Sequence, residues 1–254
     1  MTLEHKIVWN ELHSPDVDAS IAFYGALLGW TIREEERATY LHFYAGDQTV
    51  GGLVSVHPGA PPTWQVYVGT LDVEAYARRA KAAGARAVTP LMDIPHTGKL
   101  QIFLDPEGAS LAPFAPLATQ RDSWSASNAP GHFCWVELLC DDVETEVAFY
   151  TQIAGWQTLD MDVGGEPYKL FVPPGGGQQD AVGGASAKPA WAKGPSAWLP
   201  YIAVADVDAT TKRAEELGAS VLHRPADVGA FGRCSVFVDP SGVTIAVYQQ
   251  KAGC

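Results

Sequence analysis

Short alternating runs of hydrophobic and polar residues are separated along the chain by four amphipathic stretches. After Asp16, apolar side chains recur on one helical face, at Ala19, Ala22, Phe23, Ala26 and Leu27. This spacing predicts a helix with one buried side. Two later stretches carry clear end signals, because Asp72 and Asp206 are favourable N-caps and Gly84 and Gly218 are favourable helix stops. Each helix is followed by short runs typical of β-strands.

The chain repeats itself in order. The segments 8–30, 64–85 and 103–112 return as 134–156, 198–219 and 237–246. Each half in turn contains two similar units, and each unit begins with a strand near a tryptophan and continues through an aspartate into a helix. Such ordered self-similarity indicates a tandem duplication.

The repeats predict an α+β fold of four βαβββ modules, with helices on the outside of curved mixed sheets. We expect a first domain over residues 1–115 and a second over 132–254. The segment 116–131, which is rich in Ala, Ser and Pro, is expected to link them.

The excess of acidic residues limits the kinds of partner that we expect for the protein. The 254 residues carry 17 Lys+Arg against 29 Asp+Glu, a formal net charge of −12. Nucleic-acid binding rests on clustered basic residues, so we expect no nucleic-acid partner. No apolar run is long enough for a membrane span, and the segment MTLEHKIVWN lacks the apolar stretch that a secretory leader would need, so we expect neither. We therefore expect a cytoplasmic protein without a membrane partner, either a monomer or a homodimer.

Four motifs carry a family resemblance: FYGALLGW and FYTQIAGW at the ends of two helices, and LDPEGASL and VDPSGVTI at two turns. With these motifs the chain resembles the vicinal oxygen chelate superfamily, which includes glyoxalase I, extradiol dioxygenases and bleomycin-resistance proteins. It looks most similar to the tandem two-domain glyoxalase-like branch. This resemblance implies two tandem glyoxalase-like domains and a small-molecule ligand, but no single activity.

The resemblance also implies where a metal would be held, by a residue of each module's first strand and a residue of its last strand. Counting from the helix boundaries gives Trp9, Trp64, Trp135 and Trp198 for the first strands, and Gly52, Ala112, Gly184 and Ala246 for the last. An indole N–H is only a donor, and Gly and Ala offer no side-chain ligand. We therefore expect no metal at these positions, and no other cofactor.

A large indole opposite Gly or Ala has two interpretations. It can leave a flat slot in which a planar ligand stacks. It can equally fill the space as solid core. Strand alternation places Trp9, Glu11 and His13 on one face of their strand, with Leu12 on the helix side.

The segments WNEL and WVEL place Glu11 and Glu137 in mid-strand. A buried carboxylate without partners would be costly there. Each glutamate is therefore a satisfied structural acid, an acceptor that orients a ligand, or a catalytic base. Tyr40, His42 and His13 are the candidate acids, although His42 is also compatible with an ordinary sheet histidine. His96 lies in a loop that could form the mouth of a cavity.

Two functions of different classes follow. The first is metal-independent binding of a planar, partly aromatic metabolite or antibiotic. The alternative is a cofactor-free isomerase, lyase or cyclase in which Glu11 or Glu137 is the general base. A divalent-metal glyoxalase-like enzyme is a third hypothesis, which the set of available ligands disfavours.

Overall fold

The computed structural model describes residues 3–33, 40–57, 59–117 and 126–251. Its helices are α1 (Val17–Leu28), α2 (Val73–Ala82), α3 (Val143–Ala154) and α4 (Val207–Glu216), with a short 3-10 helix at Gln178–Asp180. The strands of the first half are β1 (Ile7–Ser14), β2 (Leu41–Ala45), β3 (Gln48–Ser55), β4 (Thr63–Gly69), β5 (Arg86–Ala87), β6 (Met92–Ile94), β7 (Gly98–Leu100), β8 (Phe103–Leu104) and β9 (Ser110–Pro116). Those of the second half are β10 (Phe133–Cys140), β11 (Gln157–Val163), β12 (Glu166–Val172), β13 (Gly183–Ala187), β14 (Ala197–Ala203), β15 (Ser220–Val228), β16 (Gly232–Val238) and β17 (Thr244–Gln250).

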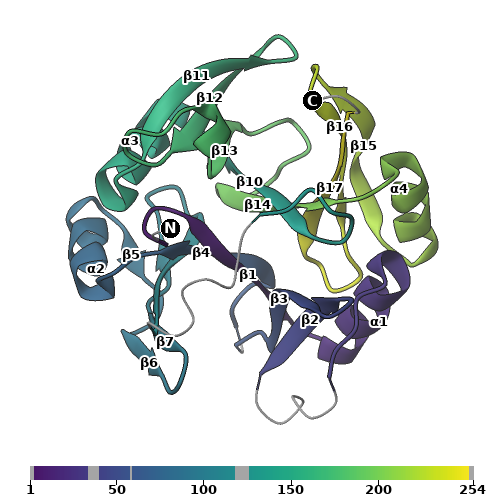
Figure 1. The fold of residues 1–254 in the computed structure, drawn as a ribbon, viewed down its shortest axis with the longest axis horizontal. Helices are drawn as coiled ribbons and strands as arrows, with labels where there is room; N and C mark the ends of the chain where they lie inside the picture. The colour runs from purple at the N-terminus through teal and green to yellow at the C-terminus, as the bar shows by residue number, and fades with distance from the viewer. Residues whose placement is uncertain (1–2, 34–39, 58, 118–125, 252–254) are drawn as a thin grey trace. The chain divides into compact units, whose positions relative to one another are not determined.

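The strands form two mixed sheets (Figure 1), with the orders β2-β3-β1-β4-β9-β7-β6 and β11-β12-β13-β10-β14-β17-β16-β15. In each module the first strand pairs in parallel with the last: β1 with β3, β4 with β9, β10 with β13, and β14 with β17. The pairs β11–β12, β15–β16, β16–β17 and β2–β3 are antiparallel. The predicted α+β chain of four βαβββ modules is thereby confirmed.

Spatial clustering divides the chain into two compact units that do not follow the repeat boundary. Unit 1 comprises residues 1–9, 66–125 and 136–198, and unit 2 comprises residues 10–65, 126–135 and 199–254. Unit 1 therefore joins the second module to the third, and α2 packs against α3 within it. Unit 2 joins the first module to the fourth, with α1 packed against α4 (Figure 1). The domain boundary expected within 116–131 stays a prediction, and residues 118–125 lie outside the described residues.

Local sequence signals explain the helices. The side chains of Asp16, Asp72, Asp142 and Asp206 each accept a backbone N–H from the first helical turn, at 2.8–3.1 Å. An N-cap carboxylate satisfies one of the free N–H groups of a helix start. The caps predicted at Asp72 and Asp206 are confirmed. The β-strand expected after α1, at residues 31–36, lies partly outside the described residues, which stop at 33 and resume at 40.

The core of unit 1 lies between the sheet and the helices. Val136 and Leu138 of β10 pack with Phe149, Tyr150 and Ile153 of α3 in one buried cluster. Burial of this apolar surface is the main favourable term for docking the helix. Among the described residues, no helix is long and apolar enough to cross a membrane.

Candidate functional site

Three adjacent strands position the glutamate of the first module. Glu11 on β1 lies beside Gly52 on β3, and Gly52 is paired in turn with His42 on β2. Gly52 had been expected opposite Trp9, two residues earlier. The residue beside the small side chain is therefore a carboxylate and not an indole.

Glu11 is held by two polar side chains. His13 Nε2 lies 2.7 Å from Glu11 Oε1, and the Tyr40 hydroxyl donates to Glu11 Oε2. The ring of His42 lies 4.9 Å from that of Tyr40, centroid to centroid. Glu11 is only 8% exposed, so these contacts supply the partners that a buried carboxylate requires. The structure thus brings together Glu11, His13, Tyr40 and His42, which we call the Glu11 cluster.

The expectation that Trp64 and Trp198 lie opposite alanines is wrong, and these two indoles match the interpretation of solid core. Both are buried, at 2% and 6% exposure. The Trp64 indole N–H donates to the Tyr24 hydroxyl at 3.1 Å, and that of Trp198 donates to the Tyr150 hydroxyl at 2.9 Å. Tyr24 and Tyr150 lie on α1 and α3, so these two tryptophans belong to the core beneath the helices.

The strand registers explain the error. Ala112 is paired with Tyr67, and Ala246 with Tyr201, three residues beyond the tryptophan in each case. In the first and third modules the paired residue is a glutamate, Glu11 or Glu137, two residues beyond the tryptophan. The four tryptophans are therefore not equivalent positions. Each half instead presents one glutamate and one tyrosine beside its small residues.

Trp9 belongs to an apolar surface of unit 1 that faces away from α2. It packs, partly exposed, against a cluster containing Tyr67 and Ala112. The other partly exposed members are Leu3, Met92, Ile94, Ile102 and Phe114. Val66 and Val68, which alternate with Tyr67 on β4, pack instead in the cluster that contains α2 residues. We call the partly exposed residues the Trp9 surface.

The second repeat keeps the glutamate and changes its partners. Glu137 on β10 is paired with Gly184 on β13 and accepts a hydrogen bond from the Ser186 hydroxyl at 2.7 Å. Trp135, two residues earlier on the strand, is partly exposed. Leu139 stands where His13 stands in the first repeat. The prediction that Glu137 acts like Glu11 thus has no histidine to support it.

Tyr168 was not predicted to be the counterpart of Tyr40. Leu170 is paired with Gly184 as His42 is paired with Gly52, and a tyrosine precedes each by two residues. The Tyr168 ring lies directly on Gly184, where an added Cβ would fall 2.3 Å from its atoms. A side chain at this position would require the Tyr168 ring to move. Alignment of YLHFY with YKLFV would have revealed this correspondence, whereas Ser186 gave no signal of its own.

His96 occupies the turn between β6 and β7 with a positive φ of 61°. It is exposed and lies in unit 1, whereas the Glu11 cluster lies in unit 2. Its assignment to a cavity mouth stays a prediction.

A metal requires several donors at one place. Among the described residues, no group of three or more His, Cys, Asp or Glu side chains could hold an ion. Beside the four small residues stand two carboxylates and two phenols, which the strands distribute over separate modules. The described side chains therefore do not fit a multidentate site at these positions.

Comparison with known proteins identifies the class to which this fold and site belong. The model of the Glyoxalase/Bleomycin resistance protein/Dioxygenase superfamily matches residues 6–112 and 131–247. The chain belongs to this superfamily. It is 31% identical to the anthracycline biosynthesis protein DnrV of Streptomyces peucetius, over 96% of this chain and 93% of that protein. It is 29% identical to CFP32 of Mycobacterium bovis, over 94% of this chain and 92% of that protein.

Solved structures support the same fold. The Mn(II)-bound glyoxalase from Novosphingobium aromaticivorans aligns with a TM-score of 0.65 at 18% identity, covering 98% of this chain and 83% of that one. The 2,2',3-trihydroxybiphenyl 1,2-dioxygenase of Sphingomonas wittichii aligns with a TM-score of 0.62 at 13% identity, covering 100% and 93%. At these identities the likeness concerns the fold alone.

Proposed function

We propose that this chain binds a planar, partly aromatic small molecule and that Glu11 accepts a hydrogen bond from a hydroxyl group of that ligand. The observation that carries the proposal is the Glu11 carboxylate, nearly buried and oriented by Tyr40 and His13. His13 and Tyr40 are themselves partly exposed and could contact the same ligand.

A further observation favours a planar aromatic ligand. DnrV and DauV, 31% and 30% identical to this chain, are both named for anthracycline biosynthesis, and anthracyclines contain planar hydroxylated rings.

Equilibrium titration tests binding. Purified protein is titrated with 1,8-dihydroxyanthraquinone, and tryptophan fluorescence is followed together with the absorbance of the probe. We expect saturable quenching at one site and no stoichiometric Ni, Zn, Fe or Mn in the sample by elemental analysis. Non-saturable quenching that free tryptophan reproduces would refute the binding proposal. A stoichiometric metal that is required for binding would refute its metal independence.

Proton transfer without a cofactor is the second candidate. It is favoured by the contact of one carboxylate with both a phenol and an imidazole, because a base beside two potential proton donors is the arrangement that isomerisation and lyase reactions need. In this mechanism Glu11 removes a proton from the ligand, and Tyr40 or His13 returns one elsewhere. The proton on Glu11 then passes to that donor through their hydrogen bond, so the reaction is redox-neutral and restores the starting protonation states.

Recovery of the ligand in D₂O separates the two candidates. Incorporation of deuterium at a carbon, abolished by Glu11→Gln with binding retained, would establish an enzyme. Unchanged ligand together with altered affinity in Glu11→Gln would establish a binding protein. Histidine 13 offers a matched variant, since His13→Gln keeps a hydrogen-bond donor near Glu11 but removes the titratable ring.

A further inference from the structure

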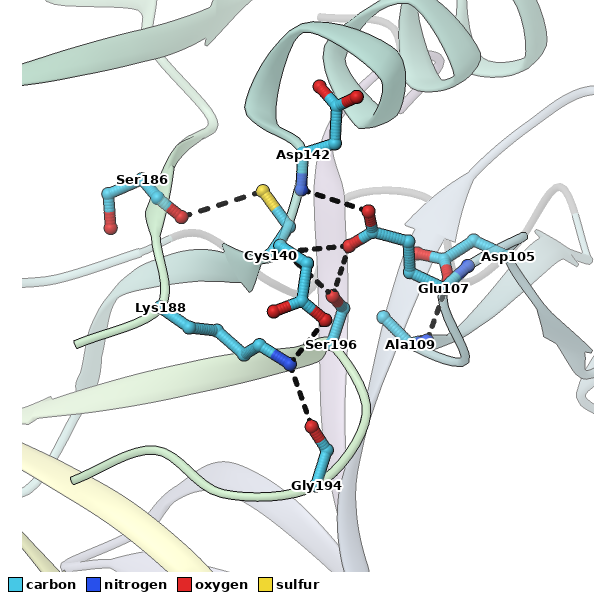
Figure 2. Close-up of polar contacts among 10 residues, drawn as sticks. Asp105, Glu107, Ala109, Cys140, Asp142, Ser186, Lys188, Gly194 and Ser196 are labelled. Carbon is cyan, nitrogen blue, oxygen red and sulfur yellow. Dashed lines mark hydrogen bonds and ion pairs between the residues drawn. The ribbon is translucent and has the colours of Figure 1, made fainter. Parts of the chain in front are cut away.

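Two carboxyls of the turn between β8 and β9, Asp105 and Glu107, lie where α3 begins, and Figure 2 shows the Ala109 N–H and Asp105 at this turn. Asp105 accepts the Ala109 N–H at 2.7 Å and the Tyr150 hydroxyl at 2.8 Å. Glu107, from the same turn, accepts the backbone N–H groups of Asp141 and Asp142 at 2.7 and 2.9 Å. The turn therefore holds the start of α3 through its carboxylates, all within unit 1.

Glu146 adds a third carboxyl to this contact between the β8–β9 turn and the start of α3. It lies on α3 and is fully buried, and neither of its oxygens has a hydrogen-bond partner among the described residues. The nearby ammonium of Lys188 is already bound to Asp141 and to the Gly194 carbonyl, each at 2.7 Å. An ionised carboxylate without a counter-charge is not stable in such a place.

Unit 2 has the same hydrogen bond between a helix tyrosine and a turn aspartate, but no counterpart of the Glu146 carboxyl. Tyr24 donates to Asp239 at 2.8 Å, as Tyr150 does to Asp105. Ser20 stands where Glu146 stands, and its hydroxyl is hydrogen-bonded to that of Ser14 at 2.7 Å. The scaffold is thus retained in both units, and only unit 1 carries a buried second carboxyl beside the aspartate.

We propose that Glu146 is held protonated against the ionised Asp105, so that the docking of α3 on the β8–β9 turn is a pH-sensitive joint that tightens as the pH falls. When α3 separates from the turn, Glu146 enters water and releases its proton. Docking therefore takes up one proton and weakens as the pH rises through neutrality.

The surrounding groups agree with this assignment. Burial, followed by the charges of Asp105 and Glu107, raises the pKa of Glu146 to about 9. Burial raises the pKa of Asp105 as well, while its hydrogen bonds from Tyr150 and Ala109 lower it. Cys140, at the end of β10, has its pKa raised by burial to about 12. Burial also raises the pKa of Tyr150 well above its usual value. The N-cap Asp142 has its pKa lowered, chiefly by the Thr145 N–H. Glu146 is therefore the group that binds a proton on docking near pH 7.

Hydrogen exchange of the full chain tests the proposal. Exchange of α3 peptides is measured from pH 6 to 8, with α1 peptides of the same molecule correcting for the intrinsic pH dependence. In the wild type we expect the opening of α3 to rise about tenfold per pH unit relative to α1. In Glu146→Gln and Glu146→Ser this excess should vanish.

Infrared spectroscopy keeps the test independent of the variants' stability. The difference spectrum of wild type minus Glu146→Gln should show the carbonyl band of a protonated carboxylic acid at pH 7, and that band should be lost as the pH rises through 9. Absence of the band at pH 7 would overturn the proposal. An excess exchange of α3 that persists in Glu146→Gln would overturn it as well.

Discussion

Tyr40 and Tyr168 occupy equivalent positions in the two repeats. The Tyr40 hydroxyl donates to Glu11, and the ring of Tyr168 lies against Gly184, the residue paired with Glu137. The neighbouring histidines of the first repeat, His13 and His42, correspond to leucines in the second. The duplication has thus kept a glutamate and a tyrosine in each half, while histidines accompany the glutamate in the first half and leucines in the second.

This difference predicts opposite results for one substitution made in each repeat. Tyr40→Phe removes a hydrogen bond to a carboxylate and should weaken binding of 1,8-dihydroxyanthraquinone by about tenfold or more. Tyr168→Phe keeps the ring over Gly184 and should leave the dissociation constant unchanged. Fluorescence titration of both variants measures the effect. Equal losses in the two variants would contradict the assignment of the site to the first repeat.

The core tryptophans should affect stability and not binding. Trp64→Phe removes the indole N–H that Tyr24 accepts, and it reduces the buried aromatic surface. We expect a loss of about 1–3 kcal/mol in the free energy of unfolding, measured by denaturant titration. The dissociation constant of 1,8-dihydroxyanthraquinone should stay at its wild-type value in Trp64→Phe. Weaker binding with unchanged stability would contradict the assignment of Trp64 to the core.

The buried amide of Asn10 leads to a substitution that should raise the free energy of unfolding. Asn10 is fully buried, and neither polar atom of its side chain has a partner among the described residues. The registers place Val136 at the same position in the other repeat. Asn10→Val should therefore raise the free energy of unfolding by about 1–3 kcal/mol, and Val136→Asn should lower it. A destabilising effect of Asn10→Val in denaturant titration would reveal a polar partner for the amide.

The raised pKa of Glu146 has a definite consequence for stability. When the pKa of a group is higher in the folded state than in the unfolded state, the group stabilises the fold fully at any pH below its unfolded-state pKa. This stabilisation is lost as the pH rises to the folded-state pKa, which is about 9 for Glu146. Between pH 6 and 8, the stability of Glu146→Gln relative to wild type should therefore increase by about 1.4 kcal/mol per pH unit. Denaturant titrations at several pH values measure this slope. A constant difference would show that folding takes up no proton there.

Much of the fold could be predicted from the sequence because its signals are local. The aspartate caps, the helical spacing after Asp16 and the repeated turn motifs each depend on a few neighbouring residues, and the structure confirms the modules. The identity of the residue beside Gly52 could not be predicted in this way, because pairing between β1 and β3 joins residues distant in the sequence. Counting from helix ends placed Trp9 there, two residues from Glu11.

The candidate site was predicted in part for the same reason. Strand alternation grouped Glu11 with His13 correctly, and the predicted acid Tyr40 does contact Glu11. The four tryptophans, by contrast, looked alike in sequence, although two of them donate to tyrosines beneath the helices. The residues paired with the four small residues each lie five positions before the N-cap aspartate of the following helix, whereas the tryptophans lie seven or eight positions before it, so they do not mark one place in the sheet.

The central claim is that Glu11, and not its repeat counterpart Glu137, binds the ligand. The most direct test is the dissociation constant of 1,8-dihydroxyanthraquinone for Glu11→Gln and Glu137→Gln, measured beside wild type at the same pH. We predict a loss of about tenfold or more for Glu11→Gln and wild-type affinity for Glu137→Gln. Wild-type affinity in Glu11→Gln, with the loss in Glu137→Gln or in neither, would contradict the claim.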